Sequence, residues 1–85
     1  MKLIFTDESW EDYLYWQKTD KKITRKINEL IKDIYRSPLS GIGKPEPLKY
    51  KYQGYWSRRI DHEHRLIYRV VKDEIWIAKC RHHYD

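Results

Sequence analysis

The stretch Lys21-Lys-Ile-Thr-Arg-Lys-Ile-Asn-Glu-Leu-Ile-Lys-Asp-Ile-Tyr-Arg36 decides the fold. Its apolar residues fall at i, i+4, i+7, i+8 and i+11, and they are Ile23, Ile27, Leu30, Ile31 and Ile34. This spacing predicts an amphipathic helix with one apolar stripe. The helix ends near Ser37-Pro38, because the residue before a proline avoids the helical region. The stripe has to be buried, and one face of a sheet is the only partner large enough in a chain of 85 residues.

A strand and a shorter helix precede this stretch. The apolar run Lys2-Leu3-Ile4-Phe5 predicts a strand, and Thr6 is a suitable cap for a helix over about residues 7–17. Lys18-Thr19-Asp20 predicts a short link with a second cap at Thr19 or Asp20.

The second half of the chain predicts a sheet. Residues 37–47 hold two glycines and three prolines, which indicates a structured loop. Beyond it, apolar and polar residues alternate, which predicts strands over 48–52, 55–60, 65–71 and 74–81 joined by tight turns. The expected order is β-α-α-β-β-β-β. This is an α+β fold in which the N-terminal strand and two helices pack on one face of an antiparallel sheet, as a single domain over residues 1–85.

The charge of the chain favours a polyanionic partner. The net charge is +5, and residues 44–85 carry ten basic and six acidic side chains. Nucleic acid, an anionic membrane surface or an acidic protein would each fit. The lone Cys80 excludes an intrachain disulfide and fits a reducing cytoplasm. No apolar run approaches the ~20 residues of a membrane span, so we expect a cytoplasmic protein without membrane attachment.

Strand alternation predicts which side chains share a face. Leu66, Tyr68 and Val70 on one strand, with Trp76, Ala78 and Cys80 on the next, suit the helices. The uncovered face then carries Arg65, Arg69, Lys79, Arg81 and His83. His82 has the parity of the core side, whereas His62 and His64 flank a turn and are expected in solvent.

Basic and aromatic residues alternate in Lys49-Tyr-Lys-Tyr52 and again in Tyr55-Trp-Ser-Arg-Arg59, which includes Arg58. Cations for phosphates and rings for unstacked bases are the two ingredients of single-stranded nucleic-acid binding. The alternative is an ordinary strand with one solvated face.

Glu46 lies between Pro45 and Pro47, which restrict the backbone and could aim its carboxylate. The alternative is a solvent-exposed loop glutamate. Metal-free RNA cleavage needs a base, cations and an acid. Glu46 as base, Arg65 with Arg59 as charge stabilisers and His83 as acid would fill these roles.

Tyr84 could orient the phosphate or a neighbouring proton donor. The plain alternatives are that Arg65 pairs with Glu63 or Asp61 on the surface and that Tyr84 anchors the terminus. The four histidines lack the usual ligand spacing and Cys80 has no thiol partner, so we expect neither a metal site nor a cofactor.

The whole chain resembles the YoeB/Txe branch of the RelE-type toxins of bacterial toxin–antitoxin modules. The resemblance is carried by six stretches: Trp10–Trp16, Lys26–Asp33, Gly43–Lys49, Trp56–Ile60, Glu63–Tyr68 and His83-Tyr84. It implies a RelE-like microbial ribonuclease fold and the toxin of a type II module. Such a toxin binds the ribosome and cuts mRNA in the A site, leaving a 2′,3′-cyclic phosphate and a 5′-hydroxyl without a divalent metal. It also implies a cognate antitoxin of the YefM/Axe type and a homodimer.

The resemblance assigns roles by position. Glu46 matches the general base, Arg65 the phosphate stabiliser, His83 the general acid and Tyr84 an orienting group. Lys49 and Arg59 match supporting basic positions, and Glu63 matches a polar neighbour of Arg65. Relatives commonly end at the tyrosine, whereas Asp85 follows it here.

Two other functions compete with RNA cleavage. A non-catalytic RNA- or ribosome-binding module would block decoding by occupancy. The chain could also help an antitoxin to repress transcription, but only as a co-repressor, because no helix-turn-helix pattern for binding DNA is evident.

Overall fold

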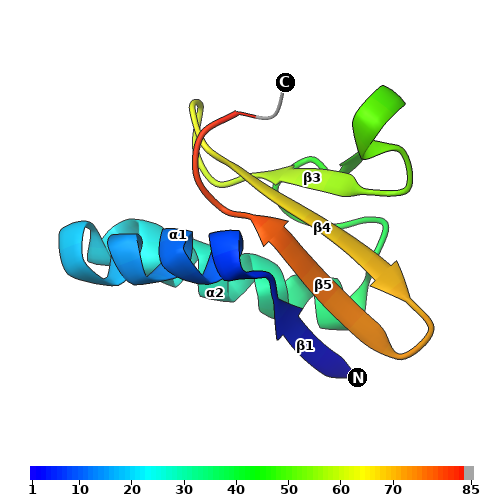
Figure 1. Ribbon diagram of the computed structural model, residues 1–85, viewed down its shortest axis with the longest axis horizontal. Helices are drawn as coiled ribbons and strands as arrows, with labels where there is room; N and C mark the ends of the chain where they lie inside the picture. Colours follow the sequence, from blue (N-terminus) through cyan, green and yellow to red (C-terminus); the bar gives the residue numbers. More distant parts are fainter. Residues whose placement is uncertain (84–85) are drawn as a thin grey trace.

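The computed structural model describes residues 1–83, and within them two α-helices pack against a five-stranded sheet (Figure 1). The strands are β1 (Lys2–Phe5), β2 (Glu46–Pro47), β3 (Trp56–Arg59), β4 (Arg65–Val71) and β5 (Glu74–Lys79), in the spatial order β1-β5-β4-β3-β2. The helices are α1 (Asp7–Thr19) and α2 (Lys21–Arg36), and a 3₁₀ turn, η1, spans Tyr50–Tyr52. The α+β class and the order β-α-α-β-β-β-β are confirmed.

The sheet is mixed rather than wholly antiparallel. β1 runs parallel to β5, with Lys2 opposite Glu74 and Phe5 opposite Ile77, while the remaining neighbours pair antiparallel. The strand predicted over residues 48–52 is wrong. The ladder between β2 and β3 closes where the Leu48 N–H donates to the Tyr55 carbonyl, so the residues between them form the loop that contains η1.

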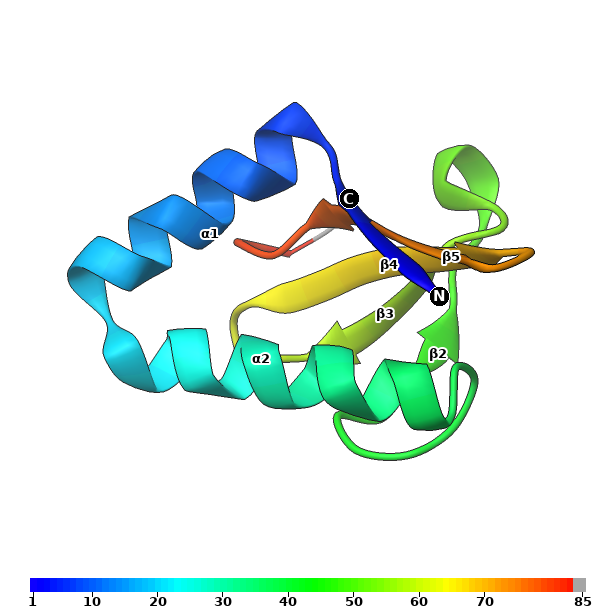
Figure 2. The ribbon, with the colours of Figure 1, turned by 90° about the horizontal axis from the view of Figure 1, so that it is seen from below.

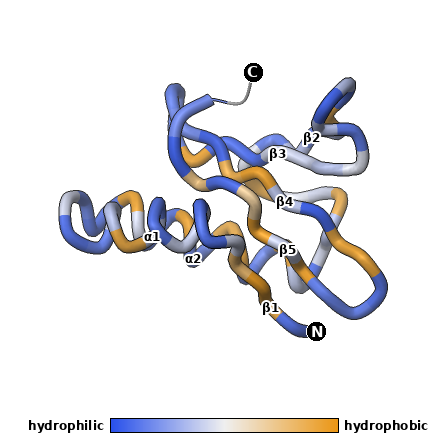
Figure 3. The backbone as a smooth tube through the Cα atoms, viewed as in Figure 1, coloured by the Kyte–Doolittle hydropathy of each residue, from blue (hydrophilic) through white to orange (hydrophobic). Residues whose placement is uncertain are grey.

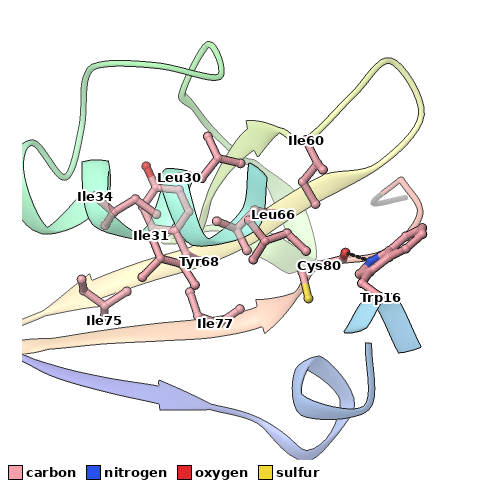
Figure 4. Packing of buried hydrophobic residues seen from close by; sticks show 11 residues of the cluster. Trp16, Leu30, Ile31, Ile34, Ile60, Leu66, Tyr68, Ile75, Ile77 and Cys80 are labelled. Carbon is pink, nitrogen blue, oxygen red and sulfur yellow. Dashed lines mark hydrogen bonds between the residues drawn. The ribbon is translucent and has the colours of Figure 1, made fainter. Parts of the chain in front are cut away.

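Both helices begin at the predicted caps. The Thr6 hydroxyl accepts the Ser9 N–H, and the Asp20 carboxylate accepts the N–H groups of Lys22 and Ile23. The apolar stripe of α2 is buried against the sheet, and α2 lies on one side of it while residues 48–55 rise on the other (Figure 2). α1 runs beside the end of β5, where Trp16 joins the same core (Figure 4).

A bulge in β5 changes which side chains face the core. Ile67 is opposite Lys79 and Tyr68 is opposite Ile77, so Ala78 is an extra residue on β5. Because a bulge resets the alternation, Ile77 and Cys80 are both buried in the core. Trp76 lies opposite Arg69 on the outer face, contrary to the prediction. Hydrophobic residues are concentrated along β1, β4 and β5, whereas residues 81–83 are hydrophilic (Figure 3).

Arg58 is buried, so its predicted role in binding substrate is wrong. The pairing of Arg58 with Leu66 places it on the core face, where its side chain is 0% exposed. The guanidinium donates to the Asp33 carboxylate, the Tyr68 hydroxyl and three backbone carbonyls, those of Ser37, Ser40 and Ile42. It therefore anchors the loop that leads into β2.

Asp33 completes this anchor from α2. The backbone N–H of Ile42 and the Arg58 guanidinium lower the pKa of its carboxyl to about 2. Gly41 passes directly over the carboxylate with φ +117°, and a Cβ there would lie 2.1 Å from Asp33 Oδ2. Only glycine fits this position, on both conformational and steric grounds.

Candidate functional site

Three of the candidate residues, Glu46, Arg59 and Arg65, share the sheet face opposite α2. Glu46 is opposite Ser57 on β3, and Arg59, two residues further, is opposite Arg65 on β4. These residues alternate with Arg58 and Leu66, which face the core. From the spacing of strands and residues, the Cα atoms of Glu46 and Arg65 are roughly 12 Å apart. Side chains of this length can reach one phosphodiester group from both positions.

A turn between β3 and β4 holds Arg65. Its side chain is 8% exposed, and Nη1 donates to the carbonyls of Asp61 and His64 at 2.8 and 3.1 Å. The Asp61 carboxylate in turn accepts the N–H groups of Glu63 and His64. Burial opposes ionisation, but these N–H groups lower the pKa of Asp61. The guanidinium is thus fixed by backbone atoms of the turn.

The chain after β5 folds back beside this turn (Figure 1). The Arg65 N–H donates to the His82 carbonyl at 3.1 Å, and the His82 N–H donates to His64 Nδ1 at 2.7 Å. Trp16 Nε1 donates to the Cys80 carbonyl at 2.8 Å, which fixes the start of the same segment. These bonds fix residues 80–82, and the backbone of His82, directly before His83, lies against Arg65.

His64 was missed as a support of the site. It was expected in solvent but is 9% exposed, with its ring 4.8 Å from that of Trp16. Extending the alternation of Leu66 and Tyr68 back to residue 64 would have placed it on the core side. His82 was expected on the core side but is exposed, because its φ of +66° interrupts the strand alternation.

The remaining candidates are exposed. Glu46, Lys49, Arg59, Glu63 and His83 all present their side chains to solvent. Glu46 and Lys49 line one hollow of about 310 Å³, together with Pro47, Leu48, Tyr50, Lys51 and Tyr52. Tyr84, the fourth predicted catalytic residue, and Asp85 lie outside the described residues.

The sheet face opposite α2, here called the outer face, was predicted to be uncovered, but part of it is covered. The Arg69 guanidinium lies 5.3 Å from the ring of Tyr55, and Lys79 Nζ lies 5.7 Å from that of Tyr52, so residues 48–55 cover part of it. Arg81 was predicted on this face but stacks on Tyr15 of α1 at 3.6 Å.

The arrangement can hold a phosphodiester between a carboxylate, two guanidiniums and an imidazole. Among residues 1–83, no group of three or more His, Cys, Asp or Glu side chains is placed to bind a metal ion. Neither helix in that range is long and apolar enough to cross a membrane.

Known proteins are similar to this chain in both sequence and fold. A family model described as "YoeB-like toxin of bacterial type II toxin-antitoxin system" matches residues 5–84. Toxin YoeB of Escherichia coli K12 is 64% identical over 84 residues, which cover 99% of this chain and 100% of that one. A YoeB dimer from Staphylococcus aureus is 53% identical with a TM-score of 0.93, covering 99% of this chain and 98% of that one. The heterotetrameric YoeB-YefM toxin-antitoxin complex of the same organism is 53% identical with a TM-score of 0.92, at the same coverages.

Proposed function

Because this chain belongs to the YoeB-like toxins of bacterial type II toxin–antitoxin systems, we propose that it cuts mRNA in the ribosomal A site and so stops translation. The observation that supports the proposal is that strand pairing and the backbone bond from Arg65 to His82 bring β2, β4 and the segment before His83 together. Glu46, Arg65 and His83 would there supply a base, a cation and an acid. These three groups suffice for attack of a ribose hydroxyl on its neighbouring phosphate.

In the proposed reaction, these side chains move two protons and stabilise the charge that forms on the phosphate. The Glu46 carboxylate takes the proton of the 2′-hydroxyl, and the 2′-oxygen forms a bond to phosphorus. Arg65 and Arg59, opposite each other on β4 and β3, stabilise the negative charge of the phosphorane-like transition state. The bond to the 5′-oxygen breaks as protonated His83 donates its proton to that oxygen. The products are a 2′,3′-cyclic phosphate and a 5′-hydroxyl.

Other proposed contributions surround this centre. Lys49 and Glu63, both exposed, would contact the nucleotides that flank the scissile phosphate, and Tyr84 would orient the phosphate. By analogy with the Staphylococcus aureus structures, we extend to this chain a homodimer and a complex with a cognate antitoxin of the YefM type. The ribosome holds the substrate.

The test is end mapping of mRNA from a purified translation reaction. Wild-type protein should yield fragments with 5′-hydroxyl ends cut within the A-site codon. Glu46→Ala and His83→Ala should each slow cleavage by roughly 10²–10⁴-fold, as expected for loss of a general base or acid. The control Glu29→Ala replaces an exposed glutamate of α2, away from the site, and should cleave like wild type.

The competing function has a different signature. A non-catalytic module would stop translation without producing mRNA fragments, and Glu46→Ala would then inhibit as well as wild type. That result would overturn the enzymatic proposal.

A further inference from the structure

The ring of Tyr50 stands apart from every other large apolar side chain on the described surface. It is 91% exposed, whereas the next most exposed, Leu39, is 58% exposed. Its backbone adopts φ +58°, a left-handed conformation that is uncommon for an aromatic residue. Strained backbone of this kind persists where the surrounding structure imposes it, and it gathers at binding sites.

Tyr50 belongs to the rim of the proposed active site. It lines the same hollow as Glu46, the proposed base. Lys49 and Lys51, its neighbours in the chain, are exposed on either side of it. The hollow therefore combines a carboxylate, an exposed ring and two ammonium groups.

The backbone that carries the ring is held in place. The Gln53 N–H donates to the Tyr50 carbonyl at 3.0 Å, and the Tyr52 N–H donates to the Lys49 carbonyl at 3.1 Å. The ring of Tyr52 lies against Lys79, and that of Tyr55 against Arg69, so the loop is braced on the sheet. An exposed ring on a fixed backbone can stack on a partner with little loss of conformational entropy.

We propose that Tyr50 is a stacking platform for one unpaired nucleobase of the A-site mRNA, with Lys49 and Lys51 contacting the phosphates on either side. This inference rests on the proposed function and assigns a subsite to it. Aromatic rings between cations are the general means of holding single-stranded nucleic acid, because every base has a face that stacks. A protein partner such as an antitoxin is the competing occupant, and the test below distinguishes the two.

The experiment measures single-turnover cleavage of ribosome-bound mRNA over a range of toxin concentrations. Tyr50→Ala should raise the concentration for half-maximal rate by roughly 5- to 150-fold, the range for loss of one base–aromatic stack. Tyr50→Phe keeps the ring and should stay within about twofold of wild type, whereas Tyr50→Leu should behave like Tyr50→Ala. Tyr35→Ala, at an exposed tyrosine of α2, is the matched control and should have no effect.

An mRNA with one abasic nucleotide identifies the stacked base. Abasic nucleotides are placed in turn at each A-site position and at the nucleotides that flank the codon. At the stacked position, the abasic substrate should raise the wild-type toxin concentration for half-maximal rate by a similar factor. Tyr50→Ala should cause no further increase on that substrate. Additive losses at every position would refute stacking on Tyr50.

The outcomes distinguish failure of the proposed cleavage function from failure of the Tyr50 stacking platform. Absence of cleavage by wild type would overturn the proposed function itself. Cleavage by wild type and by Tyr50→Ala at the same toxin concentrations would overturn only the stacking platform. Loss of antitoxin affinity in Tyr50→Ala, with unchanged cleavage, would assign the ring to the protein partner instead. All Tyr50 variants should melt within about 2–4 °C of wild type, since the ring is exposed.

Discussion

Arg58→Met should destabilise the protein far more than the same substitution at the adjacent Arg59. The Arg58 side chain is 0% exposed and donates five hydrogen bonds, including one to the Asp33 carboxylate at 2.6 Å. Methionine has a comparable volume but no donor, so the Asp33 carboxylate, the Tyr68 hydroxyl and three loop carbonyls each lose one hydrogen bond. Asp33 retains the Ile42 N–H and the exposed Arg36. We expect a loss of about 3–5 kcal/mol, the cost of breaking a buried ion pair on one side.

That loss is large for a chain of 85 residues, whose total free energy of unfolding is roughly 4–13 kcal/mol. Arg59 is exposed, so Arg59→Met should change the free energy of unfolding by less than about 0.5 kcal/mol. Urea unfolding followed by tryptophan fluorescence measures both variants. A difference of less than about 1 kcal/mol between them would refute the view that the Arg58 anchor stabilises the fold.

The same anchor predicts a pH dependence. The Asp33 pKa is lowered from 3.8 to about 2 in the folded protein. Its contribution to stability is therefore complete above about pH 4 and is lost as the pH falls through about 2. Stability of wild type should decline in that window, and Arg58→Met should show a shallower decline, because the guanidinium no longer holds the pKa of Asp33 down.

Three further predictions concern His64, two glycines and Cys80. His64→Leu fills the space beside Trp16 but removes the acceptor of the His82 N–H, so the cleavage rate at saturating toxin should fall roughly 10²-fold through misplacement of His83. His64→Asn offers an oxygen near the position of Nδ1 and should recover most of that rate, and equal rates for the two variants would contradict the positioning role. Gly54→Ala meets no atom within 4 Å and should cost about 1–2 kcal/mol in the thermal or urea unfolding assay, because its φ is +93°. Gly41→Ala should cost about 1–3 kcal/mol more, from overlap with Asp33, and equal losses would be inconsistent with that overlap. Burial raises the pKa of the Cys80 thiol, so iodoacetamide should leave native protein unmodified at neutral pH and label it only on unfolding; rapid native labelling would contradict this burial.

Periodicity predicted the elements that bury a continuous apolar face. The stripe of α2 and the alternation of β4 could be read directly, because the core residues Leu30, Ile34 and Tyr68 recur at the helix and strand periods. It failed at residues 48–52, where lysine and tyrosine alternate without a sheet partner beyond Leu48. A period of two indicates an extended backbone only where a neighbouring strand supplies hydrogen bonds. The bulge at Ala78 left no mark in the sequence either, since both registers present apolar residues to the core.

The candidate site was predictable in its chemical groups but not in its supports. Glu46, Arg65 and His83 stand out because their side chains match the needs of a known type of reaction. Arg58 was predicted to bind substrate and His64 was expected in solvent, and both predictions placed a polar side chain outside the core because burial of a polar group is costly. Each is tolerated inside because its polar atoms find partners distant in the sequence, and periodicity carries no information about such partners.

These two buried residues link stability to the proposed catalysis. Arg58 fixes the loop before β2, and the Arg59 N–H donates to the Gly43 carbonyl just before Glu46. His64 fixes the segment before His83. The proposed base and acid therefore lie on short, exposed segments, and a buried polar side chain, Arg58 or His64, helps to hold each segment. A small domain can in this way present a precise site on loops, provided that these anchors stay paired. Substitutions at Arg58 and His64 should accordingly reduce cleavage without touching RNA, and the two losses should be additive because the anchors share no contact.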